Sequence, residues 1–402
     1  MAARQTRFRV AIAAAVLTTI AAAVGCSTAG TSSATGTGPS SGTAQAVGTQ
    51  ANANKVVVPG VPTLAELYKG SYTPPPAKSP AGAKGKSVWW ISCNQATPSC
   101  SIPAAAGAAA AKALGINFHV ADGKFNVGGA FTTAIQTALA ARPSAILLYG
   151  VACQLVQGAL QQAKAQHVLV LGVNTPDCSD SGGPQLFSVH MVYGPQFPTA
   201  LDFWKAYGAA SADYIIDTSG GHAKIIDNAG SEPLQTFVDQ GFRDELKKCA
   251  GCSIVGSVPY DSATLVPNGA WIQEFRAALV KDRDATAVYL PWDVMWNELG
   301  GAQAIRQSGD KLISFGGQAA PDGVAMVRQG LITAVSSAES PTWSGYAGID
   351  AINRALQGKP QVPEGEGFEL FTLDHGMPTT NGDYEPVIPF ITDYMKAWQL
   401  AG

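Results

Sequence analysis

The sequence predicts an α/β protein of two similar lobes, each built on a parallel β-sheet. From Lys86 onward, short apolar runs of strand length alternate with longer stretches in which apolar residues recur at helical spacing. This alternation continues through two successive series, and the 402 residues of the chain are enough for two domains of ordinary size. Strict alternation of strand and helix is typical of parallel sheets that helices cover on both faces.

The first series runs from residue 87 to residue 173. We expect strands at 87–91, 117–120, 145–149 and 168–173, and helices at 103–114, 129–141 and 154–165. Within 129–141 the apolar residues Phe131, Ile135 and Leu139 stand four apart, which is the spacing of one helix face.

The second series repeats this scheme and ends in a helix that returns to the first lobe. We expect strands at 223–227, 253–258, 285–290, 311–315 and 332–336, and helices at 198–216, 234–248, 271–280, 295–308, 322–329 and 343–356.

The N-terminus carries the features of an export signal. Arg4, Arg7 and Arg9 precede an apolar run over 10–24, which is too short to make a convincing membrane span. The run ends in small residues before Cys26 and resembles a bacterial lipoprotein signal, which implies cleavage after residue 25 and lipid attachment at Cys26. An ordinary signal peptide with an incidental cysteine is the alternative. We expect residues 1–26 to be the signal and residues 27–85 to be a flexible tether that ends in a proline-rich strap.

Six cysteines follow Cys26, and an even number in an exported chain favours disulfides. The sequence alone does not choose among the ways in which they can pair. Local spacing favours three pairs, namely Cys93–Cys100, Cys153–Cys178 and Cys249–Cys252. The last pair could also be a redox CxxC, but it follows an expected helix and precedes an expected strand, whereas a redox CxxC opens a helix. A structural disulfide between Cys249 and Cys252 is therefore the favoured interpretation.

Composition and motifs argue against several other classes of function. The formal net charge of −3 gives no reason to expect a nucleic-acid partner. From Lys86 onward the chain contains no GxSxG, HExxH or GxGxxG motif, and the run ending in Ser87 lacks the leading glycine of a P-loop. The five histidines are scattered, and no second CxxC stands at zinc-ligand spacing. We therefore expect neither an enzyme nor a metal or cofactor site.

Four stretches, taken in order, carry a resemblance to a known family. They are the helix and strand within 123–148, the Asp239-Gln240-Gly241-Phe242 run, the strand and glycine-rich segment within 285–309, and the helix at 345–358. Together they resemble the type 1, ribose-binding kind of periplasmic binding protein, which includes the substrate-binding lipoproteins of sugar ABC transporters. The resemblance covers residues 86–400.

The resemblance implies two Rossmann-like lobes joined by a hinge of three chain crossings, near 190–197, 337–342 and 372–386. It places residues 86–192 and 341–372 in the N-terminal lobe, and residues 193–340 and 373–402 in the C-terminal lobe. It also implies a monomer, held outside the cytoplasm by its lipid, that passes a small ligand to the permease subunits of an ABC transporter. A ligand-sensing adaptor for a membrane receptor is the alternative.

Ligands of open parallel sheets bind beyond the carboxyl ends of the strands, and this rule selects candidate residues. The candidates are Asn94, Gln95, Val151, Asn174 and Thr175 in the first lobe, Gln235, Trp292, Asp293 and Gln318 in the second, and Glu339 and Trp343 in the crossover. Amides, carboxylates and tryptophans suit a polyhydroxylated ring, because polar groups bind the hydroxyls and an indole covers the apolar face.

Several candidates also have a purely structural interpretation. Asp293 could cap a helix, Trp343 could pack at the hinge, and Asn94 could stabilise a turn. The chain also departs from the sugar-binding pattern. Gln235 lies in the helix where the family has an arginine, and Gln318 follows two glycines where the family has an aspartate. The expected ligand is therefore a modified sugar, a polyol, or an aromatic or alicyclic compound.

Overall fold

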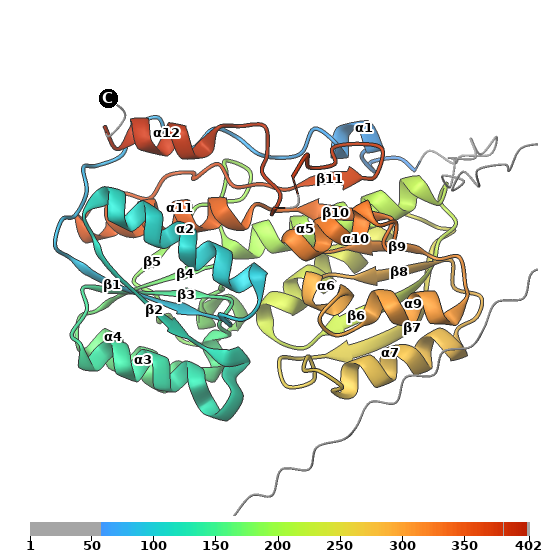
Figure 1. Ribbon diagram of the computed structural model, residues 1–402, viewed down its shortest axis with the longest axis horizontal. Helices are drawn as coiled ribbons and strands as arrows, with labels where there is room; N and C mark the ends of the chain where they lie inside the picture. The colour runs from blue at the N-terminus through green and yellow to red at the C-terminus, as the bar shows by residue number, and fades with distance from the viewer. Residues whose placement is uncertain (1–57, 381, 400–402) are drawn as a thin grey trace, which may run out of the picture. The chain divides into compact units, whose positions relative to one another are not determined.

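The computed structural model describes residues 58–380 and 382–399 (Figure 1). The expected signal peptide, the expected lipid attachment at Cys26 and most of the expected tether lie outside the described residues. Among the described residues, no helix combines the length and the apolar character needed to cross a membrane.

The first lobe is built on a five-stranded parallel sheet in the order β2-β1-β3-β4-β5. Its strands are β1 (Ser87–Ser92), β2 (Asn117–Asp122), β3 (Ala145–Tyr149), β4 (Leu169–Val173) and β5 (Val189–His190). In β1, Val88 and Trp90 belong to one hydrophobic core and Ile91 belongs to a second core. Successive side chains of a strand point to opposite faces, so both faces of this sheet are buried.

Four helices cover the two faces of the first sheet. They are α2 (Pro98–Leu114), α3 (Ala130–Ala140), α4 (Gln157–Ala165) and α11 (Pro341–Leu356). The α2 and α11 helices pack together and share the core of Trp90, whereas α3 and α4 share the core of Ile91. The α2 helix begins earlier than expected, at Pro98, because a proline is tolerated in the first turn, where its missing N–H leaves no bond unmade.

The second lobe is built on a six-stranded sheet in the order β11-β10-β9-β8-β6-β7. Its strands are β6 (Lys224–Gly230), β7 (Ser253–Tyr260), β8 (Ala287–Leu290), β9 (Ile313–Gly316), β10 (Ala334–Ala338) and β11 (Glu369–Thr372). The first five are parallel to one another, and β11 is antiparallel to β10.

The helices of the second lobe are α5 (Ala200–Thr218), α6 (Pro233–Leu246), α7 (Ala270–Lys281), α8 (Asp293–Trp296), α9 (Gly301–Ser308) and α10 (Pro321–Arg328). The single helix expected at 295–308 is wrong, since α8 and α9 are separate. The first ends at Trp296, and the second starts only after Gly300, which has a φ of 82°.

The C-terminal part of the chain differs from the expected lobe boundaries. The β11 strand pairs with β10 in the second sheet, although residues up to 372 were expected in the first lobe. The α12 helix (Phe390–Ala397) packs on α11 of the first lobe, although residues after 373 were expected in the second. Figure 1 shows α12 beside α11 and β11 beside β10. The chain therefore crosses between the lobes twice after α11, once before β11 and once between β11 and α12, whereas only the crossing near 372–386 was expected there.

The described part of the expected tether, from residue 58 to residue 85, packs against both lobes, and we call it the strap. The strap begins with α1 (Leu64–Leu67), which contacts α5 and β11. It then pairs with the hinge, where the Ser71 N–H donates to Phe368 O at 2.9 Å and the Thr73 N–H donates to Gly365 O at 3.1 Å. Further along, the Ala83 N–H donates to Asn353 Oδ1 on α11. The strap is therefore an additional crossing between the lobes.

Candidate functional site

A cavity of about 140 Å³ lies between the two lobes, beyond the carboxyl ends of their strands. Side chains of both lobes line it. The first lobe contributes Ser99, Phe125, Tyr149, Val151, Gln154, Asn174 and Thr175, and the second contributes Trp204, Glu232, Leu234, Gln235, Ser262, Leu265, Trp292 and Gln318. Of the candidates chosen from the sequence, Val151, Asn174, Thr175, Gln235, Trp292 and Gln318 lie on this cavity.

Asn174 follows β4 directly and is almost completely buried, with 3% of its surface exposed. Its φ of 50° lies in the left-handed region, which asparagine tolerates better than most residues. The Asn174 Nδ2 donates to the Tyr149 hydroxyl at 3.2 Å, and the Asn174 N–H donates to the Tyr193 hydroxyl at 3.1 Å. Its Oδ1 has no hydrogen-bond partner among the described residues. A buried acceptor without a donor costs free energy, so a ligand hydroxyl at this point would be favoured.

Glu339 lies at the end of β10 and contacts polar side chains of both lobes. Its Oε1 accepts hydrogen bonds from Gln318 Nε2 at 2.7 Å and from Asn174 Nδ2 at 3.5 Å. Burial and the nearby Glu366 raise the pKa of Glu339 to about 8. Glu339 does not line the cavity itself, but it orients the two amides that do.

Trp292 forms an aromatic wall on the second lobe. Its Nε1 donates to the Tyr260 hydroxyl at 2.6 Å, and its ring stacks on Tyr207 with centroids 6.1 Å apart and planes 17° apart. Trp204 lies against the same indole, with ring centroids 5.8 Å apart. Because Tyr260 and Tyr207 hold the Trp292 ring from two sides, its orientation is set before any ligand arrives.

Asp293 is buried, and it does not line the cavity. Its carboxylate accepts the N–H groups of Gln318 at 2.8 Å and Ala320 at 2.6 Å, and burial raises its pKa to about 7. A Cβ on Gly317 would lie 2.5 Å from Asp293 Oδ1, so the loop after β9 needs a glycine to pass over this carboxylate. The expected ligand contact is therefore replaced by a supporting role, in which Asp293 holds the loop that carries Gln318.

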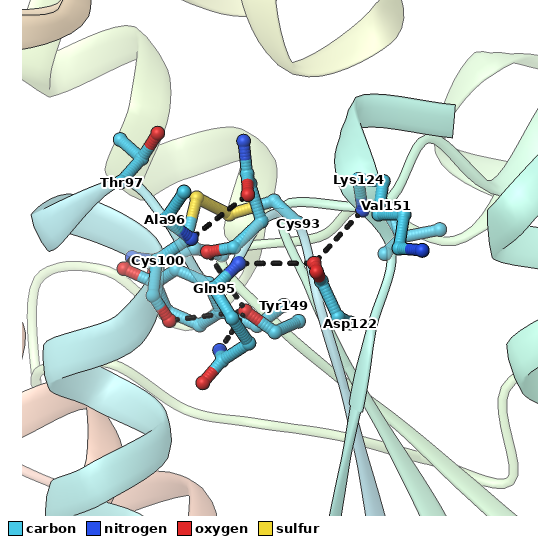
Figure 2. The surroundings of a disulfide bond; sticks show 12 residues. Cys93, Gln95, Ala96, Thr97, Cys100, Asp122, Lys124, Tyr149 and Val151 are labelled. Atoms are coloured by element: carbon cyan, nitrogen blue, oxygen red, sulfur yellow. Dashed lines mark hydrogen bonds between the residues drawn. A yellow bond between two sulfur atoms is a disulfide. The ribbon is translucent and has the colours of Figure 1, made fainter. Parts of the chain in front are cut away.

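Asn94 and Gln95 follow β1, but neither lines the cavity. The Asn94 Oδ1 accepts the Ala96 N–H at 2.9 Å, as in the turn-stabilising interpretation. The Gln95 Nε2 donates to Ser92 Oγ, and the Gln95 N–H donates to Asp122 Oδ1. Figure 2 shows Asp122 between Gln95 and Lys124, beside the Cys93–Cys100 disulfide. These two polar residues order the loops after β1 and β2 but do not line the cavity themselves.

Trp343 is fully buried at the hinge and lies away from the cavity. Its ring stacks on Phe390 with centroids 4.4 Å apart, and its Nε1 donates to Glu364 O at 3.0 Å. Tyr72 of the strap packs against the same indole, with ring centroids 5.3 Å apart. Trp343 therefore has the hinge-packing role that the sequence left open.

Gln235 and Glu232 form the polar start of α6 at the cavity. The Gln235 Nε2 donates to Glu232 Oε2 at 3.0 Å, and the Glu232 N–H donates to Gln235 Oε1. The Ser262 hydroxyl donates to the same Glu232 carboxylate at 2.6 Å. This cluster presents acceptors to the cavity where the family pattern has a cation, so it suits a ligand that donates hydrogen bonds.

The structure pairs the cysteines as local spacing favours, in Cys93–Cys100, Cys153–Cys178 and Cys249–Cys252. Three of these cysteines, Cys93, Cys100 and Cys153, line the cavity. Within residues 58–380 and 382–399, the side chains of Cys153, Asp177 and Cys178 form the one group close enough to hold a metal ion. The two sulfurs of that group are joined to each other, so they are not thiolate ligands.

A hydrogen bond also joins the lobes outside the cavity. The Thr97 hydroxyl, at the start of α2, donates to Glu298 Oε2 at 3.2 Å. Glu298 lies between α8 and α9 of the second lobe. Together with the Asn174–Glu339 contact, this bond links the first lobe to the second lobe and the crossover.

A comparison with protein families gives the site its context. Residues 94–360 match the family described as the periplasmic binding protein domain, which is well over half of the chain. The chain belongs to this family. Periplasmic binding proteins bind ligands and are not enzymes, in agreement with the missing catalytic motifs. No curated protein matches the sequence.

Solved structures share the fold of this periplasmic binding protein. A solute-binding protein of an ABC transporter from Burkholderia graminis, in complex with D-arabinose, has a TM-score of 0.60 and 18% identity over 74% of this chain and 98% of its own. A glucose-galactose binding protein from Geobacillus stearothermophilus has a TM-score of 0.60 and 16% identity over 72% and 98%. A solute-binding protein from Mycobacterium smegmatis with bound glycerol has a TM-score of 0.59 and 16% identity over 75% and 99%. At these identities the likeness shows the fold alone.

Several residues that line the cavity of this periplasmic binding protein were missed in the sequence. Trp204 lies on α5 rather than after a strand, so the strand-end rule could not select it. Tyr149 is the last residue of β3, and Phe125 belongs to the short 3-10 helix η1 (Lys124–Gly129) after β2. A wider window around each strand end would have included Tyr149 and Phe125, whereas Trp204 carries no such signal.

Proposed function

We propose that this periplasmic binding protein is the solute-binding component of an ABC transporter and holds a single sugar or polyol in the cavity. The observation that carries the proposal is the buried Oδ1 of Asn174, which has no partner among the described residues, in a cavity that Gln318 and Glu232 also line. A polyhydroxylated ligand supplies hydroxyl donors to such acceptors and takes hydrogen bonds from the amides.

The aromatic residues of the cavity support the same class of ligand. Trp292 and Trp204 on the second lobe, and Tyr149 and Phe125 on the first, give apolar surface beside the polar groups. A sugar ring has an apolar face as well as hydroxyls, and an indole covers the apolar face. The same rings favour the second candidate, an aromatic or alicyclic compound that carries several hydroxyls.

The size of the cavity favours one ring rather than an oligosaccharide. Its volume of about 140 Å³ corresponds to roughly five water molecules at about 30 Å³ each. A cavity of this size suits one small ring and not a chain of linked rings. The neighbours with bound D-arabinose and glycerol, and others with bound allitol and myo-inositol, support a ligand of this size.

Family membership implies a location outside the cytoplasm. We propose that lipid on Cys26 anchors the protein to the outer face of the cell membrane, and that ligand binding shifts the lobes toward a closed form that the permease recognises. The signal before Cys26 supports the anchor, and the family supports the permease as partner.

The experiment is a thermal-shift screen of the full chain, followed by calorimetry. The panel contains D-arabinose, D-galactose, allitol and myo-inositol, together with the aromatic acid benzoate and the alicyclic acid cyclohexanecarboxylate. We expect a sugar or polyol to raise the melting temperature, because a ligand that binds only the folded state stabilises it by mass action. Binding of benzoate with no binding of any polyol would overturn the proposal. The strap must be present, because a chain that begins at Lys86 lacks the contacts of residues 71–83 with both lobes.

A further inference from the structure

Two disulfides lie in one wall of the cavity, and the third lies elsewhere in the fold. Cys93 and Cys100 line the cavity as a pair, and Cys153 lines it from the next strand-end loop. The Cys249–Cys252 disulfide follows α6 and precedes β7, so it lies at the amino end of a strand, away from the carboxyl ends that form the cavity.

The wall of the first lobe consists of four loops, one after each of β1, β2, β3 and β4. The Phe125 N–H donates to Cys93 O at 2.8 Å, which ties the second loop to the first. A Cβ on Gly150 would lie 3.2 Å from Cys93 Sγ, so the first disulfide packs directly against the third loop. Three of the four loops therefore meet at Cys93.

The second disulfide ties the remaining loop into the same wall. Cys153 belongs to the 3-10 helix η2 (Cys153–Leu155) after β3, and Cys178 begins the 3-10 helix η3 (Cys178–Ser181) after β4. The Val151 N–H donates to Thr175 Oγ1 at 3.2 Å beside this bridge. The two disulfides are thus connected through the short segment from Gly150 to Cys153.

We propose that these two disulfides act as one positioning device, which holds the first-lobe wall in its binding geometry and so sets the affinity of the cavity. The proposal rests on the proposed function of the cavity. Loops that are already ordered lose less conformational entropy when a ligand binds, and a cross-link supplies that order. Because the segment from Gly150 to Cys153 connects the two disulfides, loss of either one loosens all four loops of the wall.

The test compares three pairwise substitutions in the full chain. The sugar or polyol of highest affinity among D-arabinose, D-galactose, allitol and myo-inositol is the probe. C93A/C100A and C153A/C178A should each raise its Kd by about tenfold, whereas the control C249A/C252A should change it less than about twofold. The four-residue variant should raise the Kd by much less than the product of the two pairwise effects, because the pairs are coupled. Effects that multiply, or an equal effect of the control, would overturn the proposal.

A second measurement needs no ligand and separates this proposal from the function of the cavity. Amide hydrogen exchange in C93A/C100A should accelerate by about tenfold in 150–156 and 174–181, although neither segment contains a substituted residue. The first disulfide closes a loop with a sequence separation of only 7, so its loss costs folding stability less than the loss of the second, with a separation of 25. Unchanged exchange in both segments would show that the wall is not a coupled unit, whether or not a sugar binds.

Discussion

Gln318 Nε2 donates a 2.7 Å hydrogen bond to Glu339 Oε1, and this bond joins the loop after β9 to the crossover after β10. Gln318 lines the cavity, while Glu339 lies behind it and is almost fully buried. The carboxyl group of Glu339 thereby positions an amide that lines the cavity. The protonation state of this carboxyl group therefore affects the bond between the loop after β9 and the crossover.

Substitution of Glu339 should change how stability depends on pH. Burial raises the pKa of Glu339 to about 8, above the ordinary 4.5, so the folded state binds this proton more tightly than the unfolded state. The stability that this group contributes is complete below about pH 4.5 and is lost as the pH rises through about 8. E339Q should therefore be more stable than the original protein at pH 8.5, by on the order of 2 kcal/mol, with little difference at pH 4.5. Urea unfolding at both values measures this, and an equal difference at both would contradict it.

Removal of the Asn174 side chain should weaken ligand binding without strain in the backbone. Asn174→Gly suits the left-handed conformation of this residue and deletes the unpartnered Oδ1. We expect the affinity for the bound sugar or polyol to fall at least about tenfold, because a hydrogen bond in a buried site is lost. Asn94→Gly is the matched control, since Asn94 also follows a strand but lies off the cavity. Calorimetry measures the ligand affinity of both variants. An equal loss of affinity in the control would show that Asn174 is not a ligand contact.

Two buried tryptophans should respond differently to substitution by alanine. Trp292→Ala should weaken binding at least about tenfold and leave the protein folded, because the ring lines the cavity and covers a ligand face. Trp343→Ala should mainly lower the free energy of unfolding, by about 3–5 kcal/mol, because the fully buried ring packs against Phe390 and Tyr72. Calorimetry and urea unfolding on both variants separate affinity from stability. Unchanged affinity in the first variant would exclude Trp292 as a ligand contact.

The strap should influence the hinge through Tyr72. The Tyr72 hydroxyl donates to Ala338 O at 3.1 Å, and its ring packs on Trp343 and Tyr384 of two other crossings. Tyr72→Ala should change ligand affinity by about threefold or more although Tyr72 does not line the cavity, because hinge contacts bias the balance of open and closed forms.

Tyr68→Ala is the control for the strap, since among the described hinge residues Tyr68 contacts only the crossing after β11, through Thr372 and His375, whereas Tyr72 joins that crossing to Ala338 and Trp343. It should leave affinity unchanged. Small-angle scattering with and without sugar measures closure directly. If both variants bind and close as the original chain does, the strap has no part in the hinge.

The strands and most helices could be predicted because their signals are local. The apolar run at 145–149 coincides with β3, since a strand buried on both faces needs a continuous apolar segment. The pairing of the cysteines followed from short separations along the chain for the same reason. The two-residue β5, the antiparallel β11 and the helix α12 were missed, because each is short and is stabilised by elements far away in the sequence. Composition predicted a flexible tether that ends in a proline-rich strap, but it gave no sign that the backbone groups of the strap pair with the hinge.

Asn94 and Asn174 show the difference most clearly. In the sequence they are equivalent, since each follows a predicted strand, and the strand-end rule selects both. In the folded chain Asn94 turns back to the N–H of Ala96, two residues away. Asn174 instead meets Tyr149 and Glu339, which are 25 and 165 residues distant. The sequence by itself determined which ends of the strands form the cavity, whereas contacts between distant loops decided which side chains enter it.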